Sequence, residues 1–247
     1  MVALILACDR SSVHASPLSF REIAPGLHYA AVDRIASIGG SPHAAHVLRF
    51  EARALQLRVV TQEQTGTALA DAEAFRAAVG ALAAFNGGFF DPLHKPLGLL
   101  VSQGRQLSPL RKVDHGVFAI VAGTASVRHA SQWRPDPDVE FAVQCGPRLL
   151  VDGEVPHFRS PQAARRTAIA LDGPGRVLVV VTDAEVSLDA LARWIRTPVD
   201  HGGPGAVQAL NLDGGPSTML SVRAEPHRIA VTTPVAVPVG IALLARR

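Results

Sequence analysis

Three glycine-bearing segments of the chain each carry a polar side chain able to take part in chemistry. They are residues 86–91, which begin with Asn86, residues 144–148, and residues 211–218, which contain Asp213. Each follows an apolar run, so each polar group is expected at a strand end, where a glycine turn lets a ligand approach the backbone closely. A carboxylate such as Asp213 suits proton transfer, and a guanidinium such as Arg166 binds anions. We expect these segments to line one shared cleft.

Local turn bonding is the alternative explanation for each segment taken alone. Asn and Asp side chains bond their own backbone and tolerate left-handed dihedral angles. Three such segments in one chain, together with the Arg165-Arg166-Thr167 run, favour the shared cleft. A turn or capping role is an open alternative for Asn86, Asn211, Asp213, Ser217 and Thr218. For Ser217 and Thr218 it is slightly favoured over a substrate contact.

The spacing of apolar residues predicts mostly strands and a few helices. Alternation over residues 47–51 and 55–60 predicts two strands of a hairpin. Apolar spacings of three and four after Asp71 predict a helix of about three turns, capped by Asp71, that runs into a buried strand ending at Asn86. Ser187 is expected to cap a second helix over residues 188–196. Further strands are expected over residues 97–101, 117–121, 125–128, 141–145, 148–151, 167–171, 176–182 and 207–212, and in two stretches of residues 229–244.

Two of these expectations include a strand partner or a position in the sheet. Residues 167–171 and 176–182 flank Asp172-Gly-Pro-Gly175 and predict a hairpin of buried strands. Pro234 and Pro238 interrupt the last stretches, so at least one of them is expected at a sheet edge.

The order of elements predicts an α+β fold: a single domain with a mixed, mostly antiparallel β-sheet core and a few helices packed outside. Residues 20–247 are assigned to this domain. Residues 1–19 are assigned to a signal remnant or lipoprotein tether, because an apolar run leads to Cys8 as it does before a lipid-modified cysteine. The run lacks a preceding Lys or Arg and is shorter than the ~7–15 residues of a signal core, so an ordinary N-terminus is the alternative.

Five motifs follow one another along the chain: Asn-Gly-Gly-Phe-Phe from Asn86, Pro-Leu-Gly from Pro96, Gly-Pro-Arg-Leu from Gly146, Arg-Thr-Ala from Arg166, and Leu-Asn-Leu-Asp-Gly-Gly-Pro-Ser-Thr from Leu210. In this order they resemble the motifs of the phosphodiester glycosidase domain family. The resemblance covers roughly residues 47–243. It implies hydrolysis of a sugar-phosphate diester with an N-acetylglucosamine-type sugar, and we expect the substrate on an exported or surface glycan. Pro216 departs from the motif, since many relatives carry a glycine there, and it removes one amide donor.

Such a reaction needs a fixed site for the anion and an acid beside the sugar, where positive charge develops. Arg166 is expected to hold the phosphate and is preferred to Arg165 because it matches the family motif. Asp213 is expected to stabilise the ring charge, attack it or activate water. Asn86 completes the catalytic candidates by bonding sugar hydroxyls or orienting Asp213. The candidates for substrate binding are Gly87, Gly88, Asp91, His115, Gly146, Thr167, Asn211, Gly214, Gly215, Ser217 and Thr218.

Two other functions stay open. A non-catalytic cell-envelope protein would bind anionic glycans through the same cleft, and a phosphodiesterase would break the phosphorus–oxygen bond instead of the carbon–oxygen bond. No metal site or cofactor is required by the sequence, although a divalent cation on Asp213 and a neighbour is an alternative. No zinc, EF-hand, phosphate-loop, dinucleotide or serine-hydrolase motif is present in the sequence.

Composition excludes further classes of protein. With 247 residues, 48% of them hydrophobic, the chain can bury a core and is not disordered. Its net charge of +3 comes from dispersed arginines without a basic run, which argues against a nucleic-acid partner. Two cysteines give no disulfide framework, and Cys145 has the surroundings of a core residue. We expect an exported protein, periplasmic or anchored as a lipoprotein, with membrane contact only through a lipid on Cys8.

Overall fold

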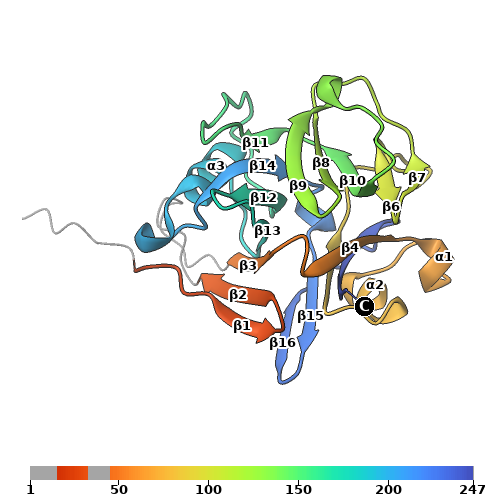
Figure 1. Ribbon diagram of the computed structural model, residues 1–247, viewed down its shortest axis with the longest axis horizontal. Helices are drawn as coiled ribbons and strands as arrows, with labels where there is room; N and C mark the ends of the chain where they lie inside the picture. Colours follow the sequence, from red (N-terminus) through yellow and green to blue (C-terminus); the bar gives the residue numbers. More distant parts are fainter. Residues whose placement is uncertain (1–15, 33–44, 247) are drawn as a thin grey trace, which may run out of the picture.

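The computed structural model describes residues 16–32 and 45–246, and their strands form one sheet of seven strands and two of five (Figure 1). Every pairing between the strands in these two ranges is antiparallel. Cys8 and most of the expected tether lie outside the described residues. No helix within the described residues is both long and apolar enough to cross a membrane.

The seven-stranded sheet is buried on both faces along its centre. Its order is β1 (Arg21–Ala24), β2 (Leu27–Val32), β3 (Ala45–Phe50), β13 (Val177–Thr182), β12 (Thr167–Asp172), β14 (Ala206–Asn211) and β11 (Arg148–Leu150). Every residue of β12 and β13 is buried, which explains their nearly continuous apolar runs. Helix α3 (Leu188–Arg196) packs Leu191, Trp194 and Ile195 with the residues of one face, and the Ser187 hydroxyl caps it by accepting from the Ala190 amide at 3.2 Å.

The two five-stranded sheets lie on the other side of the molecule. One has the order β7 (Arg105–Ser108), β6 (Leu100–Ser102), β10 (Val139–Cys145), β8 (Gly116–Val121) and β9 (Thr124–His129). The other has the order β16 (His227–Val231), β15 (Leu220–Ala224), β5 (Ala83–Asn86), β17 (Gly240–Ala245) and β4 (Leu55–Val60). Helix α2 (Ala72–Ala78) packs Phe75 against this third sheet, and α1 (Gln62–Thr65) precedes it. Three short 3-10 helices span Ala130–Gln132, Val199–His201 and Gly215–Ser217.

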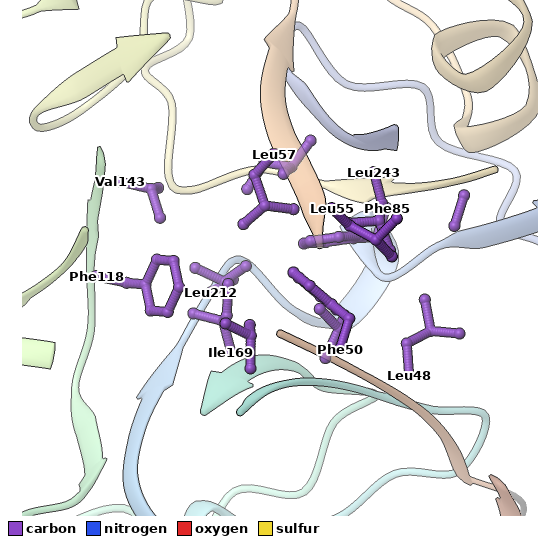
Figure 2. Close-up of a cluster of buried hydrophobic side chains, with 14 of the residues drawn as sticks. Leu48, Phe50, Leu55, Leu57, Phe85, Phe118, Val143, Ile169, Leu212 and Leu243 are labelled. Atoms are coloured by element: carbon purple, nitrogen blue, oxygen red, sulfur yellow. The ribbon is translucent and has the colours of Figure 1, made fainter. Parts of the chain in front are cut away.

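One hydrophobic core joins the three sheets (Figure 2). Leu48, Phe50 and Ile169 enter it from the seven-stranded sheet, Phe118 and Val143 from the second sheet, and Leu57, Phe85 and Leu243 from the third. Burial of these side chains holds the sheets at fixed positions relative to one another.

The expected elements are largely confirmed, with one wrong pairing. Asp71 caps α2 by accepting from the Ala74 amide, α3 has the expected bounds, and β12 pairs with β13 as a hairpin. Strand β16 lies at a sheet edge, as the prolines predict. The hairpin expected from residues 47–60 is wrong: β3 pairs with β2 and β13, whereas β4 pairs with β17 in a different sheet. Helix α2 also has seven residues and is therefore shorter than three turns.

Two further differences concern the sheets. The sequence predicts one mixed sheet, and the described residues instead build three antiparallel ones. Strands β1, β2, β7 and β15 are absent from the sequence prediction. Strands β1 and β7 are short and largely exposed and carry weak apolar alternation, whereas β2 and β15 are mostly buried. The prediction of few helices packed outside a mostly antiparallel core holds.

Candidate active site

Residues from three of the sequence motifs lie at the ends of three strands. Asn86 is the last residue of β5, Thr167 is the first of β12, and Asn211 is the last of β14. Because β12 and β14 are antiparallel neighbours with Ala168 opposite Asn211, the start of one strand lies beside the end of the other. The Thr167 hydroxyl donates to Asn86 Oδ1 at 2.7 Å and so joins the third sheet to the first.

Asn86 uses its whole side-chain amide inside the protein. Its Oδ1 accepts from the Thr167 hydroxyl and from the Met219 amide at 3.3 Å, and its Nδ2 donates to the Asp213 carbonyl at 2.7 Å and the Gly87 carbonyl at 3.3 Å. The side chain is 1% exposed. Of the two expected roles, this geometry fits orientation of the Asp213 loop and leaves no free group for a sugar hydroxyl.

Asp213 is half-buried on the loop that follows β14. Its Oδ1 accepts from the Gly214 amide at 2.9 Å, and the Ser217 hydroxyl also bonds the carboxylate. Burial raises the pKa of the Asp213 carboxyl above its usual value, while the bonds from Ser217 and Gly214 act in the opposite direction. A carboxyl group with a raised pKa is suited to proton transfer nearer neutral pH.

Arg166 lies beside the Asp213 loop and carries an unpaired charge. A Cβ atom built on Gly214 would lie 3.8 Å from Arg166 Nη1. The guanidinium donates from Nε to the Val186 carbonyl at 3.0 Å and from Nη2 to the Gln162 carbonyl at 2.7 Å, and no carboxylate of the described chain pairs with it. Burial lowers the pKa of this guanidinium, which remains charged. A half-buried cation without a carboxylate partner can accept an anion, so Arg166 stays the predicted phosphate ligand.

Arg165 is held by the protein through both terminal nitrogens, while its buried Nε has no partner in the described chain. Its Nη1 donates to the Thr232 carbonyl at 2.9 Å, and its Nη2 pairs with Asp183 at 3.6 Å. The Arg165 carbonyl accepts from the Gly215 amide at 2.7 Å. Because Arg165 pairs with a carboxylate and Arg166 does not, Arg166 stays the preferred candidate for the anion ligand.

The glycines of the site allow close packing of backbone. An added Cβ would lie 2.8 Å from Val239 Cγ1 at Gly87, 3.1 Å from the Gln144 carbonyl at Gly88, and 2.9 Å from the Arg165 carbonyl at Gly214. Gly215 has a φ of 58°, the left-handed region that favours glycine. The amides of Gly87, Gly214 and Gly215 already bond Val239 O, Asp213 Oδ1 and Arg165 O. They would have to exchange acceptors to hold a phosphate, so a packing role fits them better than the expected substrate contact.

His115 lies next to the two segments that contain Phe89 and Gly146. Its ring packs against Phe89 with 5.8 Å between centroids, and an added Cβ at Gly146 would lie 2.8 Å from its Cδ2. Burial lowers the pKa of His115, Asp114 raises it and Arg111 lowers it, with a net decrease that favours the neutral ring. Its Nδ1 is buried without a partner in the described chain. His115 therefore stays a predicted site residue, placed between the segments that contain Phe89 and Gly146.

The remaining candidates divide between the site and local turns. Asn211 donates from Nδ2 to the Gly146 carbonyl at 3.0 Å, which fixes the 146–148 segment, and its Oδ1 has no partner in the described chain. Thr218 is fully buried, and its hydroxyl likewise lacks a described partner. Asp91 accepts from the Leu93 and Lys95 amides at 2.8 and 2.9 Å, so it fits the turn alternative. The Ser217 hydroxyl bonds the Asp213 carboxylate, and its predicted capping role stays a prediction.

Some groups that hold the candidate site in place could not be predicted from the sequence. The Val186 and Gln162 carbonyls that hold Arg166 are main-chain groups, which any residue supplies. Cys145 is fully buried beside Asp213, and burial raises the pKa of its thiol to about 12, as suits the expected core residue. No group of three His, Cys, Asp or Glu side chains able to hold a metal ion is found in residues 16–32 and 45–246.

A cavity near the candidate site is lined by residues of α2, β15 and β16. It has a volume of about 210 Å³, and its lining includes Glu73, Arg223 and the segment from Arg228 to Thr233. The Thr233 hydroxyl donates to the Pro216 carbonyl, which brings this cavity to the end of the Asp213 loop. Asp213 and Arg166 themselves do not line it.

Comparison with known proteins adds independent findings. A family model described as phosphodiester glycosidase matches residues 79–244. YigE of Escherichia coli (strain K12), an uncharacterised protein, is 24% identical over 148 residues, and the alignment covers 55% of this chain and 56% of YigE. The aligned part therefore spans little more than half the length of that relative.

Three solved structures share the fold. The catalytic domain of zebrafish N-acetylglucosamine-1-phosphodiester alpha-N-acetylglucosaminidase, auto-inhibited by its pro-peptide, superposes with a TM-score of 0.68 at 16% identity, over 94% of this chain and 87% of that chain. A Synechocystis protein gives 0.66 at 17% identity, over 94% and 64% of the two chains. A Burkholderia pseudomallei protein named as exported gives 0.60 at 13% identity, over 98% and 100%.

Proposed function

The chain belongs to the phosphodiester glycosidase family, and from that premise we propose that it hydrolyses a sugar-phosphate diester at the bond between the sugar and the phosphate. The observation that carries the proposal is the half-buried, unpaired Arg166 beside the Asp213 loop, whose carboxyl has a raised pKa. We propose an N-acetylglucosamine-type sugar and an exported or surface glycan as the substrate.

Arg166 binds the phosphate in this proposal. A diester carries one negative charge, and the free Nη1 edge of Arg166 supplies a charge-assisted donor to a non-bridging oxygen. Because two carbonyls hold the rest of the guanidinium, the donor is fixed before the substrate arrives. Cleavage at the anomeric carbon releases a phosphate monoester and transfers one water oxygen to the sugar.

Asp213 faces the sugar. Positive charge grows on the ring as the phosphate leaves, and a carboxylate there stabilises it, attacks the anomeric carbon or takes a proton from water. Phosphate is a good leaving group, so the site needs a second acid less than ordinary glycosidases do. Asn86 keeps the Asp213 loop in place, and neutral His115 is available for a sugar hydroxyl or a proton.

The direct test compares Asp213→Asn with the wild type on a chromogenic N-acetylglucosamine phosphodiester. We expect kcat/KM to fall roughly 10²–10⁴-fold, the usual size of an acid–base contribution. Asp138→Asn, at an exposed residue that lines a separate cavity, is the matched control and keeps full activity. Unchanged activity of the Asp213 variant removes the mechanism.

The unpaired Arg166 also favours a second candidate, a non-catalytic envelope protein that binds anionic glycans, since an anion site does not require turnover. This function predicts saturable glycan binding that Arg166→Gln abolishes and Asp213→Asn leaves intact. Reaction in heavy-oxygen water separates a third candidate, because phosphorus–oxygen cleavage places the label in phosphate and glycosidic cleavage places it in the sugar.

We also propose that the protein acts outside the cytoplasm, with or without a lipid on Cys8. The shared fold with a protein named as exported supports this location. Mass spectrometry of the protein purified from its host, with Cys8→Ser as control, detects the lipid directly.

A further inference from the structure

Two loops next to the candidate site leave the same end of one hairpin. Strands β6 and β7 pair with Leu100 opposite Ser108, and the Ser108 hydroxyl bonds the Pro96 carbonyl at 3.5 Å. Residues 91–95 precede this end of the hairpin, and residues 109–114 follow it. Because antiparallel partners meet at one end, the two loops emerge side by side. Phe89 precedes the first loop and His115 ends the second, and their rings are in contact.

The loops carry an unusual set of exposed side chains. Leu93 is 75% exposed, the highest value among the four exposed large hydrophobic residues of the described chain, and Val113 is 37% exposed. The chain has only two lysines, Lys95 and Lys112, and each lies within two residues of one of these apolar side chains. Arg111 is also exposed, and none of the three cations forms an ion pair with a described residue.

Both acidic residues of the two loops form hydrogen bonds within the protein. Asp91 accepts from the Leu93 and Lys95 amides, and Asp114 pairs with His129 at 3.0 Å. With both carboxylates counted, the two loops carry three cations against two anions, a net charge of +1 with the histidines neutral.

Gln144 holds the second loop and the adjoining strand in position. Its Oε1 accepts from the Leu99 and Arg111 amides at 3.0 and 2.9 Å, and its Nε2 donates to the Arg111 carbonyl at 2.8 Å. The side chain is 2% exposed. The base of the loop is thus ordered before any partner arrives, so binding costs little additional ordering.

We propose that residues 91–95 and 109–114 dock on an anionic phospholipid surface. Leu93 and Val113 enter the boundary between head groups and acyl chains, and Lys95, Arg111 and Lys112 face the anionic head groups. A soluble polyanion would use the cations alone, since it offers no apolar region for the two exposed aliphatic side chains. Docking in this way holds Phe89 and His115, and with them the candidate site, next to substrates carried at the membrane.

The test is sedimentation of the full-length chain with vesicles of phosphatidylcholine, with or without 30 mol% phosphatidylglycerol. We expect binding to the anionic vesicles, weakened roughly 30-fold by Lys95→Gln combined with Lys112→Gln and roughly tenfold by Leu93→Ser. Val207→Ser and Arg53→Gln, at exposed residues of other elements, are the matched controls and bind as the wild type. Hydrolysis of the soluble chromogenic diester stays unchanged in all variants if the proposed activity holds.

Two outcomes overturn the inference. Equal vesicle binding by the wild type, the lysine variant and Leu93→Ser shows that another part of the chain makes the contact. Binding to soluble dextran sulfate that the lysine variant loses and Leu93→Ser retains, without vesicle binding, shows a polyanion site instead of a membrane surface. Binding is measured without turnover, so failure of the proposed activity leaves this test intact.

Discussion

The pKa of the Asp213 carboxyl group is set by opposing local effects. Burial disfavours its ionised form, and the Ser217 hydroxyl and Gly214 amide favour that form. Of the two donors, only Ser217 acts through a side chain, so it can be removed without altering the backbone.

Ser217→Ala therefore raises the pKa of Asp213 further. The limb of the kcat/KM profile that reports Asp213 moves to higher pH, whether the group acts ionised, which gives an acidic limb, or protonated, which gives an alkaline one. Measured pH profiles of the wild type, Ser217→Ala and the control Ser126→Ala check this expectation. A shift to lower pH, or an equal shift in the control, contradicts it.

Asn86 shows why one atom can matter at a buried site. Asn86→Asp replaces the donor that faces the Asp213 carbonyl at 2.7 Å by an acceptor oxygen, and it buries a charge. We expect a loss of about 3 kcal/mol in the free energy of unfolding and a lower kcat with little change in KM. Urea unfolding and steady-state kinetics measure both.

Thr167→Val is the matched comparison for Asn86. It keeps the side-chain shape, removes only the hydrogen bond to Asn86 Oδ1, and should cost about 1 kcal/mol. If Asn86→Asp were as stable as the wild type, the amide would not be fixing the loop.

At the scale of elements, local signals predict the existence of a helix or strand better than its partner. Asp71 and Ser187 cap α2 and α3 as their sequences predict, since a cap acts within one turn. The wrong hairpin has the opposite cause. Residues 51–54 form a real turn, with Ala54 N bonded to Glu51 O, but β4 finds its partner in β17, nearly two hundred residues later. Short-range periodicity contains no information about such a pairing.

The same limit applies to the candidate site. Asn86, Arg166 and Asp213 could be selected as candidates from the sequence because a cation, an acid and glycine turns occur in an order that resembles the family motifs. The carbonyls of Gln162 and Val186 that fix Arg166, and the filled amide of Asn86, follow only from the three-dimensional arrangement.

Helix α2 is fastened to β15 by a charge cluster that predicts a pH effect. Two Arg76 bonds, with help from Ser221 and Arg223, hold the pKa of Glu73 at about 2. A lowered pKa stabilises the fold above the ordinary value near 4.5, and this contribution disappears as the pH falls toward 2.

Glu73→Gln should therefore lower the free energy of unfolding by about 1 kcal/mol at pH 7, a modest value because the side chain is 42% exposed. The difference from the wild type should shrink steadily between pH 4.5 and pH 2. Thermal melts across this range check it, with Glu63→Gln, at an ion pair whose two side chains are 64% and 66% exposed, as the surface control. A difference that stays constant with pH contradicts the cluster's role.

At the scale of the whole molecule, the shared core predicts a single unfolding unit. Phe118 of the second sheet contacts Phe141 with ring centroids 6.1 Å apart and belongs to the same buried cluster as Phe50 and Phe85 of the other two sheets (Figure 2). No sheet can lose its inner face to water without exposing the others, so the described residues from 16 onward should unfold together, as the predicted single domain over residues 20–247 requires.

Phe118→Ala tests this cooperativity away from the proposed catalytic groups. Removing a fully buried aromatic ring should cost about 3–5 kcal/mol and lower the midpoint of unfolding without changing kcat at low temperature. Loss of activity and loss of far-ultraviolet circular dichroism should follow one curve in urea, for the variant as for the wild type. Two separated transitions, with activity surviving the first, would show that the second sheet unfolds independently and that the core does not couple the three sheets.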